Sequence, residues 1–278
     1  MTDPRSSDEA PNAAERRRWN HDYWTSIWPK REALTDSVTD VLLEHASLLP
    51  GMHLLEIGSG GGKTAIAAGR LVAPDGDVVG ADLSVQLTEL ATQRAKEAGA
   101  ANVRYSVADM QYETLDDRPF DAAISQFGVM FFDEPVTAFT NIAKHVVRNG
   151  ALTFACWQPF DVNPWHPGEA TAAFLPPVPA PAPGKSPTGP FALADAGATA
   201  SMLEAAGWSD VACTLYDRHV VVARDAFVDD GQLAFMGISE PQLPEALARL
   251  DAHTRQFEVG DGRYELPIAF QIFTATRA

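Results

Sequence analysis

Short apolar runs alternate with amphipathic segments through the middle of the chain, and this alternation predicts the fold class. The apolar runs are predicted strands, and they cover residues 53–57, 77–81, 103–107, 120–125 and 151–157. Segments with helical periodicity lie between them at 63–71, 84–98 and 135–147. The strands are apolar at nearly every position, which is typical of a parallel sheet covered by helices on both faces. We therefore expect a doubly wound α/β fold.

The N-terminal fifth of the chain has a different pattern. Residues 1–12 are polar and are predicted to be a disordered tail. Residues 13–28 form a predicted helix rich in Trp and Tyr, Pro29 is expected to end it, and 33–49 is a second predicted helix. We interpret residues 13–50 as a helical lid over a ligand site. The alternative is that the aromatic face only packs against the main domain.

Residues 158–190 interrupt the alternation, since they hold ten of the 20 prolines of the chain. Such a segment cannot form a central strand or a long helix, so we expect an extended excursion on the surface. Beyond it, the pattern predicts a helix at 193–206, a strand at 211–216, one or two helices within 224–254 and a last strand at 266–276. We thus expect a core at 51–157, and 191–278 as the C-terminal part of the same domain, with a helical insertion.

Composition and charge exclude several classes of partner. The 278 residues carry a net charge of −16, which argues against a nucleic-acid partner, since a phosphate-binding surface needs clustered Lys and Arg. No leader-like or membrane-spanning apolar run is found, so we expect a cytoplasmic protein without a membrane span. The two cysteines provide neither a disulfide framework nor a zinc site, and we expect no metal. The oligomeric state stays open, a homo-oligomer included.

The chain's most informative stretch is the glycine-rich turn after the first predicted strand. A P-loop ending at Gly62-Lys63-Thr64 would need glycine where Ile57 stands, and the dinucleotide fingerprint would need glycine in place of Lys63. An acid followed by alternate glycines fits instead, as Glu56, Gly58, Gly60 and Gly62, with Ser59 between them. A strand, a glycine turn and a helix N-terminus form a site where a ligand can touch the backbone.

Acidic residues follow the next two strands at similar spacing. Asp82, with Leu83 beside it, comes 26 residues after Glu56, and Asp109-Met110 follows 27 residues later. An acid at the second strand end suits ribose hydroxyls, although Asp82 would serve a nicotinamide dinucleotide or a helix cap equally well. An Asp beside a Met suits an adenine amino group and ring. The fourth strand ends near Ser125 or Gln126, and Gln126 and Phe127 should lie near the reactive end of a ligand, with a core role for Phe127 as the alternative.

These motifs, in this order, resemble those of class I S-adenosylmethionine-dependent methyltransferases. The strand and loop at 120–132 belong to the same set of motifs, and the stretches 189–195 and 203–211 are similar to the tail of the ubiquinone/menaquinone-biosynthesis-like subgroup of small-molecule methyltransferases. The resemblance implies a Rossmann-like seven-stranded sheet with the last strand antiparallel, and S-adenosylmethionine as cofactor. It places Glu56 and the glycines at the methionine moiety, Asp82 at the ribose, and Asp109 with Met110 at the adenine. The proline-rich insertion departs from the subgroup, so the subgroup's substrate is not carried over.

The acceptor side is less clear from the sequence. The sequence indicates no clear general base, so the catalytic residue is unknown. His166 is the one candidate, as a base or a substrate contact. The alternative is that it is a plain loop histidine. Aromatic residues suggest an apolar or aromatic small-molecule acceptor, and the candidate contacts are Tyr23, Trp28, Trp157 and Trp165. The acceptor atom, O, N or C, stays open. A nicotinamide-dependent oxidoreductase and a non-catalytic module that binds S-adenosylmethionine are the alternative functions.

Overall fold

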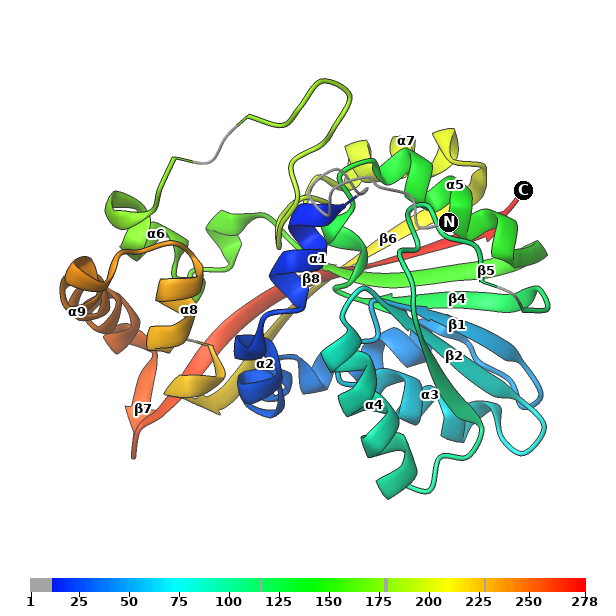
Figure 1. Ribbon diagram of the computed structural model, residues 1–278, viewed down its shortest axis with the longest axis horizontal. Helices are drawn as coiled ribbons and strands as arrows, with labels where there is room; N and C mark the ends of the chain where they lie inside the picture. The colour runs from blue at the N-terminus through cyan, green and yellow to red at the C-terminus, as the bar shows by residue number, and fades with distance from the viewer. Residues whose placement is uncertain (1–11, 116, 178–179, 228) are drawn as a thin grey trace, which may run out of the picture.

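The computed structural model describes residues 12–115, 117–177, 180–227 and 229–278. The predicted disordered tail lies outside these residues, apart from Asn12. Within the described ranges, eight strands form one sheet in the order β3-β2-β1-β4-β5-β8-β6, with β7 pairing beside β8 (Figure 1). The strands are β1 (His53–Ile57), β2 (Asp77–Asp82), β3 (Val103–Val107), β4 (Phe120–Gln126), β5 (Val146–Trp157), β6 (Trp208–Ala223), β7 (Glu258–Gly260) and β8 (Arg263–Arg277).

The strand directions confirm the predicted architecture. Strands β1 to β5 pair in parallel, and β8, the last strand in the sequence, lies antiparallel between β5 and β6. The short strand β7 was not predicted, and it pairs with the start of β8. The carboxyl ends of β1 to β5 therefore lie along one edge of the sheet, where ligands bind in open α/β sheets.

Helices cover both faces of the sheet, as the apolar strands predicted. In Figure 1, α3 (Lys63–Val72) and α4 (Val85–Glu97) lie below the sheet, and α5 (Pro135–His145) and α7 (Ala196–Ala205) lie above it. Leu54 and Leu55 are adjacent on β1 and belong to two different hydrophobic clusters, and both are fully buried. Successive side chains of a strand point to opposite faces, so β1 supplies both halves of the core.

The N-terminal region is helical, but the predicted break at Pro29 is wrong. Helix α1 (Ala13–Trp19) ends before Asn20, and α2 (Asp22–Ala46) runs through Pro29 without interruption. Proline removes one backbone donor from a helix, and burial of the turns that follow offsets that loss. The buried apolar residues of α2 are Ile27, Leu34, Val38, Leu42, Leu43 and Ala46.

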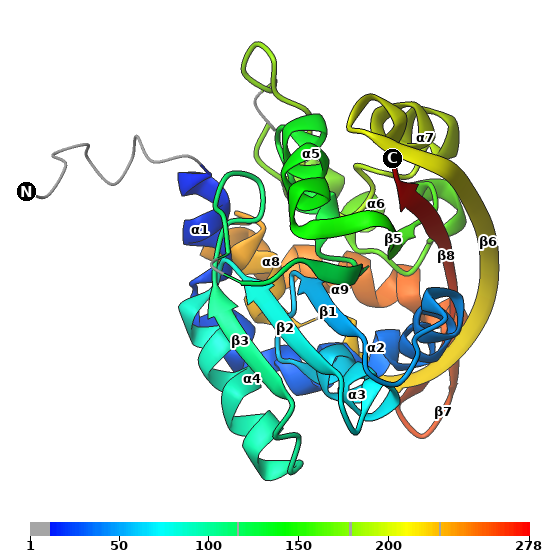
Figure 2. The same cartoon turned by 90° about the vertical axis from the view of Figure 1, so that its right-hand side faces the viewer.

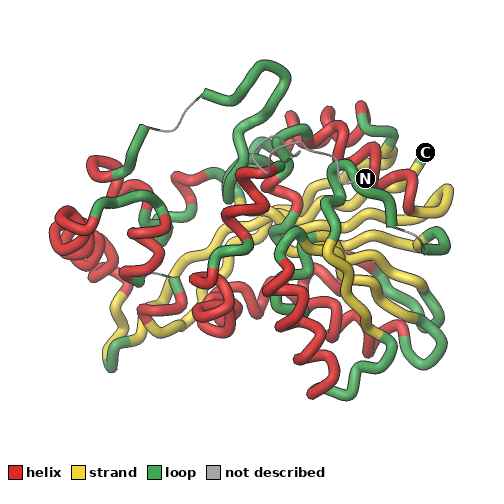
Figure 3. Tube along the Cα trace, viewed as in Figure 1, coloured by secondary structure: helices red, strands yellow, loops and turns green. Residues whose placement is uncertain are grey.

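The proline-rich region and the C-terminal insertion form short helices and loops around one end of the molecule (Figure 3). The α-helices here are α6 (Gly168–Thr171), α8 (Asp230–Phe235) and α9 (Leu243–Thr254). The 3₁₀ turns of the chain are Val129–Phe131, Phe160–Val162, Ala172–Phe174, Arg224–Ala226, Glu240–Gln242 and Arg255–Phe257. The predicted helices within 224–254 are thus found, and the proline-rich segment contains more local helix than we expected.

Strands β6 and β8 are longer than the sequence predicted. They pair continuously out to Ala223 and Arg263, well beyond the ends of their neighbours. Figures 1 and 2 show this pair running from the sheet to the α8–α9 region. Among the described residues, no helix is long and apolar enough to cross a membrane. The domain division and the cytoplasmic location stay predictions.

Candidate functional site

A cavity of about 310 Å³ lies at the carboxyl ends of the parallel strands, under the N-terminal helices. The strand ends form its floor, α2 forms one wall, and the loops after β4 and β5 form another. The residues of the predicted site that line it are Trp28, Glu56, Gly58, Ser59, Asp82, Leu83, Asp109, Met110, Gln126, Phe127, Trp157, Trp165 and His166. Gly60, Gly62 and Tyr23 do not line it. The fold thus brings most of the predicted residues together.

Glu56 is a buried carboxyl group with an unused oxygen. It is 1% exposed, lines the cavity at the end of β1, and its Oε2 has no hydrogen-bond partner within the part of the chain that the structure describes. Burial raises the pKa of Glu56 well above its usual value, and the nearby Asp82 adds to this rise. The Ser59 hydroxyl beside it is also buried without a partner. Unpaired buried polar atoms are costly, so this corner suits a cationic hydrogen-bond donor of a ligand.

Asp82 has both carboxylate oxygens engaged by backbone groups. Oδ1 accepts from the Ser84 N–H and Oδ2 from the Gly60 N–H, each at 2.8 Å. Burial raises the pKa of Asp82, and these two bonds oppose that rise. Each carboxylate oxygen has two lone pairs, so Asp82 can still accept from two ligand hydroxyls.

The glycines of the turn make close contacts inside the protein, in addition to any room that they leave for a ligand. A Cβ on Gly58 would lie 2.6 Å from Cα of Gly128, and a Cβ on Gly62 would lie 2.4 Å from the Tyr105 hydroxyl. A Cβ on Gly60 would lie 2.2 Å from the Trp28 ring. The interpretation of these three glycines as ligand space alone is therefore too simple, since each also packs against another part of the fold.

Asp109 binds the N-terminal region, which the sequence motifs did not reveal. Its Oδ2 accepts from the Asn12 side-chain amide at 2.9 Å, and its Oδ1 accepts from the Gln111 N–H at 3.0 Å. The Arg16 guanidinium lies 3.7 Å from Oδ2. Burial raises the pKa of Asp109, and these contacts oppose the rise. Asn12 lies in a polar stretch without periodicity, so only the folded chain could place it in the cavity wall.

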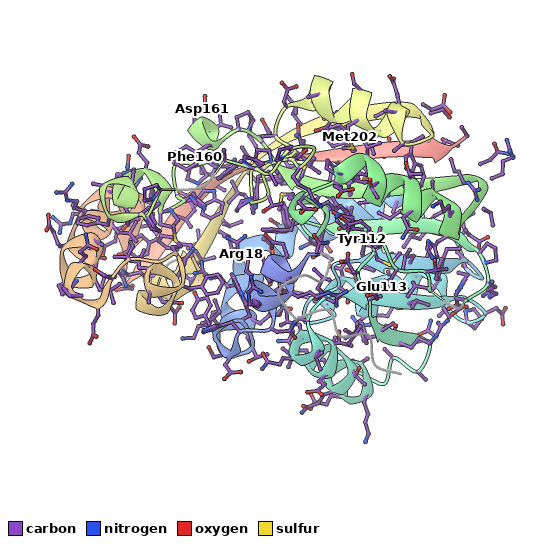
Figure 4. All side chains as sticks on the ribbon, turned by 45° about the horizontal axis from the view of Figure 1, so that its top comes forward. Arg18, Tyr112, Glu113, Phe160, Asp161 and Met202 are labelled. Atoms are coloured by element: carbon purple, nitrogen blue, oxygen red, sulfur yellow. The ribbon has the colours of Figure 1, made fainter. Side chains whose placement is uncertain are left out.

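Aromatic side chains of α1 and α2 close the cavity from above. Trp19 stacks on Trp24 at 4.7 Å between ring centroids, and Trp24 meets Trp28 edge-on at 6.4 Å. Trp19 also meets Phe131 at 4.8 Å, and the Arg18 guanidinium lies 5.9 Å from the same ring. Figure 4 labels Arg18 on α1, next to the core domain. Trp19, Trp24 and Trp28 all line the cavity, and the role of residues 13–50 as a lid stays a prediction.

The far end of the cavity is apolar and follows β4 and β5. Phe127 has a left-handed backbone, with φ of 63°, and its ring stacks on Trp157 with 4.2 Å between centroids. Positive φ is unusual for a bulky residue and is found where the surrounding structure enforces it. Trp157 packs against Trp165 at 5.1 Å, and His166 comes next in the chain. Gln126 accepts from the Thr39 hydroxyl at 2.9 Å, so α2 is tied to the end of β4.

Tyr23 lies in a polar contact between α2 and α8. Its hydroxyl donates to the Asp229 carboxylate at 3.2 Å and accepts from Arg31, also at 3.2 Å. Arg31 also binds Gln232, and both line the cavity. Neither Arg31 nor Gln232 was predicted, because neither belongs to a motif. Tyr23 thus supports the cavity wall from behind, and a substrate contact by Tyr23 is left without geometric support.

Comparison with known proteins identifies the family of the core. A family model described as a methyltransferase domain matches residues 54–150. The chain is 33% identical over 124 residues to protein-L-isoaspartate O-methyltransferase of Thermotoga maritima, a match that covers 44% of this chain and 36% of the relative. It is 25% identical over 177 residues to a ubiquinone/menaquinone biosynthesis C-methyltransferase of Pseudomonas entomophila, over 56% of this chain and 69% of that protein.

The fold also has solved counterparts. The YcgJ protein of Bacillus subtilis superposes with a TM-score of 0.59 at 15% identity, over 87% of this chain and 98% of its own. The chain spans less than half the length of the first curated relatives that it matches, two named protein-L-isoaspartate O-methyltransferase and one named arsenite methyltransferase. The matched domain, the sheet order and the sequence motifs agree with one another: residues 54–150 form a methyltransferase domain of the class I, S-adenosylmethionine-dependent type.

Proposed function

We propose that the protein transfers the methyl group of S-adenosylmethionine to a small-molecule acceptor with an apolar, largely aromatic binding surface. The observation that carries the proposal is the row of carboxyl groups from Glu56, Asp82 and Asp109. These three residues end or follow three neighbouring strands, are nearly buried, and line one cavity. Three separate buried acids in one apolar cavity are costly for the fold, and they suit a ligand with hydrogen-bond donors along its length.

The residues present fit that cofactor from end to end. Glu56, with its unpartnered Oε2, would accept from the α-ammonium group, and Asp82 would accept from the two ribose hydroxyls. Asp109 would accept from the adenine amino group, with Met110 and Leu83 beside the ring. Asn12 holds an amide donor on Asp109 at the position that this assignment gives to the adenine amino group. The adenine amino group would bind to a second lone pair of the Asp109 carboxylate, or it would displace Asn12 from it.

When bound, the cofactor supplies an electrophilic methyl group on a sulfonium for transfer to a nucleophile. The chain's own contribution is placement. Residues Phe127, Trp157 and Trp165 form flat walls beside the predicted methionine end, where they would orient an acceptor. Holding reacting atoms about 3–3.5 Å apart and aligned supplies roughly 7–11 kcal/mol of the barrier reduction. The indole rings of α1 and α2 exclude water from the same space.

The test is calorimetric titration of the folded protein with S-adenosylhomocysteine and, separately, with reduced nicotinamide dinucleotide. We expect one site for S-adenosylhomocysteine and no heat from the dinucleotide. Binding of the dinucleotide alone would contradict the proposal and favour an oxidoreductase. Release of S-adenosylhomocysteine from S-adenosylmethionine in the presence of candidate acceptors then separates an enzyme from a module that only binds the cofactor.

A further inference from the structure

His166 stands at the apolar end of the cavity, where the sequence suggested a general base. Its ring is held by aromatic neighbours on three sides: Phe191 at 5.1 Å, Phe160 at 5.6 Å and Trp165 at 5.8 Å between centroids. Phe160 is labelled in Figure 4, in the loop that follows β5. His166 itself lines the cavity. The imidazole is thus fixed in orientation rather than free to rotate.

One backbone hydrogen bond decides which ring nitrogen carries the proton. The Gly168 N–H donates to Nδ1 of His166 at 3.1 Å. The approach is close, since a Cβ on Gly168 would lie 3.0 Å from the same nitrogen. A nitrogen that accepts a hydrogen bond cannot carry a proton, so the neutral ring has its proton on Nε2. Nε2 has no hydrogen-bond partner among the residues that the structure describes.

This geometry is unsuited to a base. The lone pair of Nδ1 is used by Gly168, and Nε2 is already protonated. Burial and, to a smaller extent, the positive charge of Arg31 lower the pKa of His166 to about 4, so the ring stays neutral near pH 7. The structure therefore does not support a base at this position, and a substrate contact or a plain loop histidine is left.

We propose that His166 binds the methyl acceptor by donating its Nε2–H to an oxygen atom of that molecule. The inference rests on the proposed function and adds the acceptor's chemistry. The acceptor would be a flat apolar molecule that lies along Phe127 and Trp157 and carries a carboxylate or carbonyl oxygen. Arg31 lines the same cavity and lies 4.0 Å from the Asp229 carboxylate, and its buried Nε–H has no partner among the described residues, so it is a second donor for the acceptor's oxygen group. An acceptor with an ammonium or amino group at this position would face two donors and be rejected.

Two variants of His166 distinguish the role of the Nε2–H donor from that of the hydrogen bond between Nδ1 and the Gly168 N–H. His166→Asn keeps an oxygen near the position of Nδ1 to accept from Gly168, and it loses the Nε2 donor. His166→Gln places an amide N–H near the position of Nε2. The probes are 2-naphthoate and 2-naphthylamine, which share one flat ring system and differ in the oxygen group. Titrations are made into the full chain saturated with S-adenosylhomocysteine.

We expect 2-naphthoate to bind at least about tenfold more tightly than 2-naphthylamine, the scale of one hydrogen bond to a charged group. His166→Asn should lose most of that preference, and His166→Gln should recover part of it. Equal binding of the two probes, or an unchanged preference in His166→Asn, would overturn the proposal.

The tautomer is measured independently in the cofactor-free protein by long-range ¹H–¹⁵N correlation, with the His166 signals assigned from their loss in His166→Asn. We expect a protonated Nε2 and an unprotonated Nδ1. The reverse tautomer would overturn the inference even where S-adenosylhomocysteine binds. Absence of S-adenosylhomocysteine binding, by contrast, would refute the proposed function and leave the tautomer result standing.

Discussion

Trp28 of α2 lies directly on Gly60 and Gly61 of the glycine turn. A Cβ on Gly60 would come within 2.2 Å of Trp28 Cζ2, and a Cβ on Gly61 would come within 2.4 Å of Cδ1. No real side chain tolerates such distances, so the Trp28 ring of α2 packs directly against the backbone of the glycine turn. The glycines of this motif therefore serve a contact between distant parts of the chain as well as the cofactor.

This contact predicts a coupling between the two positions. Gly61→Ala should reduce the free energy of unfolding by about 1–3 kcal/mol, because Trp28 and Arg94 must move to admit the methyl group. In a Trp28→Ala background the same change should cost much less, since the flexible Arg94 is the remaining obstacle. Urea unfolding of the parent, the two single variants and the double variant measures the coupling energy between positions 28 and 61. Gly197→Ala is the matched control, because its Cβ would meet Asp195 at the ordinary contact distance of 3.5 Å. This variant should not reduce the free energy of unfolding. Additive effects would contradict the described contact.

Glu56 should oppose stability in the absence of ligand. Its pKa is raised in the folded protein, so the folded state binds more protons than the unfolded state, and stability falls as the pH rises above the usual pKa of a glutamate. Glu56→Gln should therefore raise the melting temperature of the cofactor-free protein at pH 8 and weaken S-adenosylhomocysteine binding. A second readout is the dependence of the binding enthalpy on the buffer, since a cationic ligand group would release the proton of Glu56. The opposite change in melting temperature would contradict the raised pKa.

Asp82 is predicted to hold the ribose. Asp82→Asn should weaken S-adenosylhomocysteine binding by about 1–3 kcal/mol, the scale of hydrogen bonds to a charged group. The amide oxygen still accepts one of the two backbone bonds from Gly60 and Ser84, which limits damage to the turn. Calorimetry measures the affinity, and thermal unfolding checks the fold. Glu204→Gln, at an exposed position of α7 that does not line the cavity, is the control of equal charge change. An affinity equal to that of the parent would place the ribose elsewhere.

The lowered pKa of His166 predicts that the folded protein loses stability in mild acid. Its folded pKa of about 4 lies below the ordinary value of 6.5, so between these values the unfolded state binds the extra proton. Stability should fall as the pH drops through this window, with a slope of at most about 1.4 kcal/mol per pH unit from this group. Urea unfolding from pH 7 to pH 4.5 measures the slope in the parent and in His166→Asn, where the carboxyl groups titrate alike. Identical slopes would show that His166 does not carry the effect.

The parallel core was predictable because its signals are local. Continuous apolar runs predicted β1 to β5, and residues at their carboxyl ends must converge once the strands are parallel, which placed Glu56, Asp82 and Asp109 in one site. Non-local packing determined the rest. Burial of α2 overrode the break expected at Pro29, and pairing with each other lengthened β6 and β8 beyond their apolar segments. Asn12, Arg31 and Gln232 enter the cavity from segments that carry no motif, so the sequence could not place them.

The pairing of β6 with β8 lets one wall of the cavity change in evolution while the cofactor residues stay as they are. The segment between β6 and β8 begins after Ala223 and ends before Arg263, two residues that face each other across the pair, and within it only the short strand β7 pairs with the sheet among the described residues. An insertion whose ends are neighbours can be lengthened, shortened or exchanged without altering the register of the strands that carry it. Gln232, from this insertion, lines the cavity, whereas Glu56, Asp82 and Asp109 stand on the other side of the sheet order. Related enzymes could thus acquire new acceptors by replacing this one segment while keeping the same methyl donor.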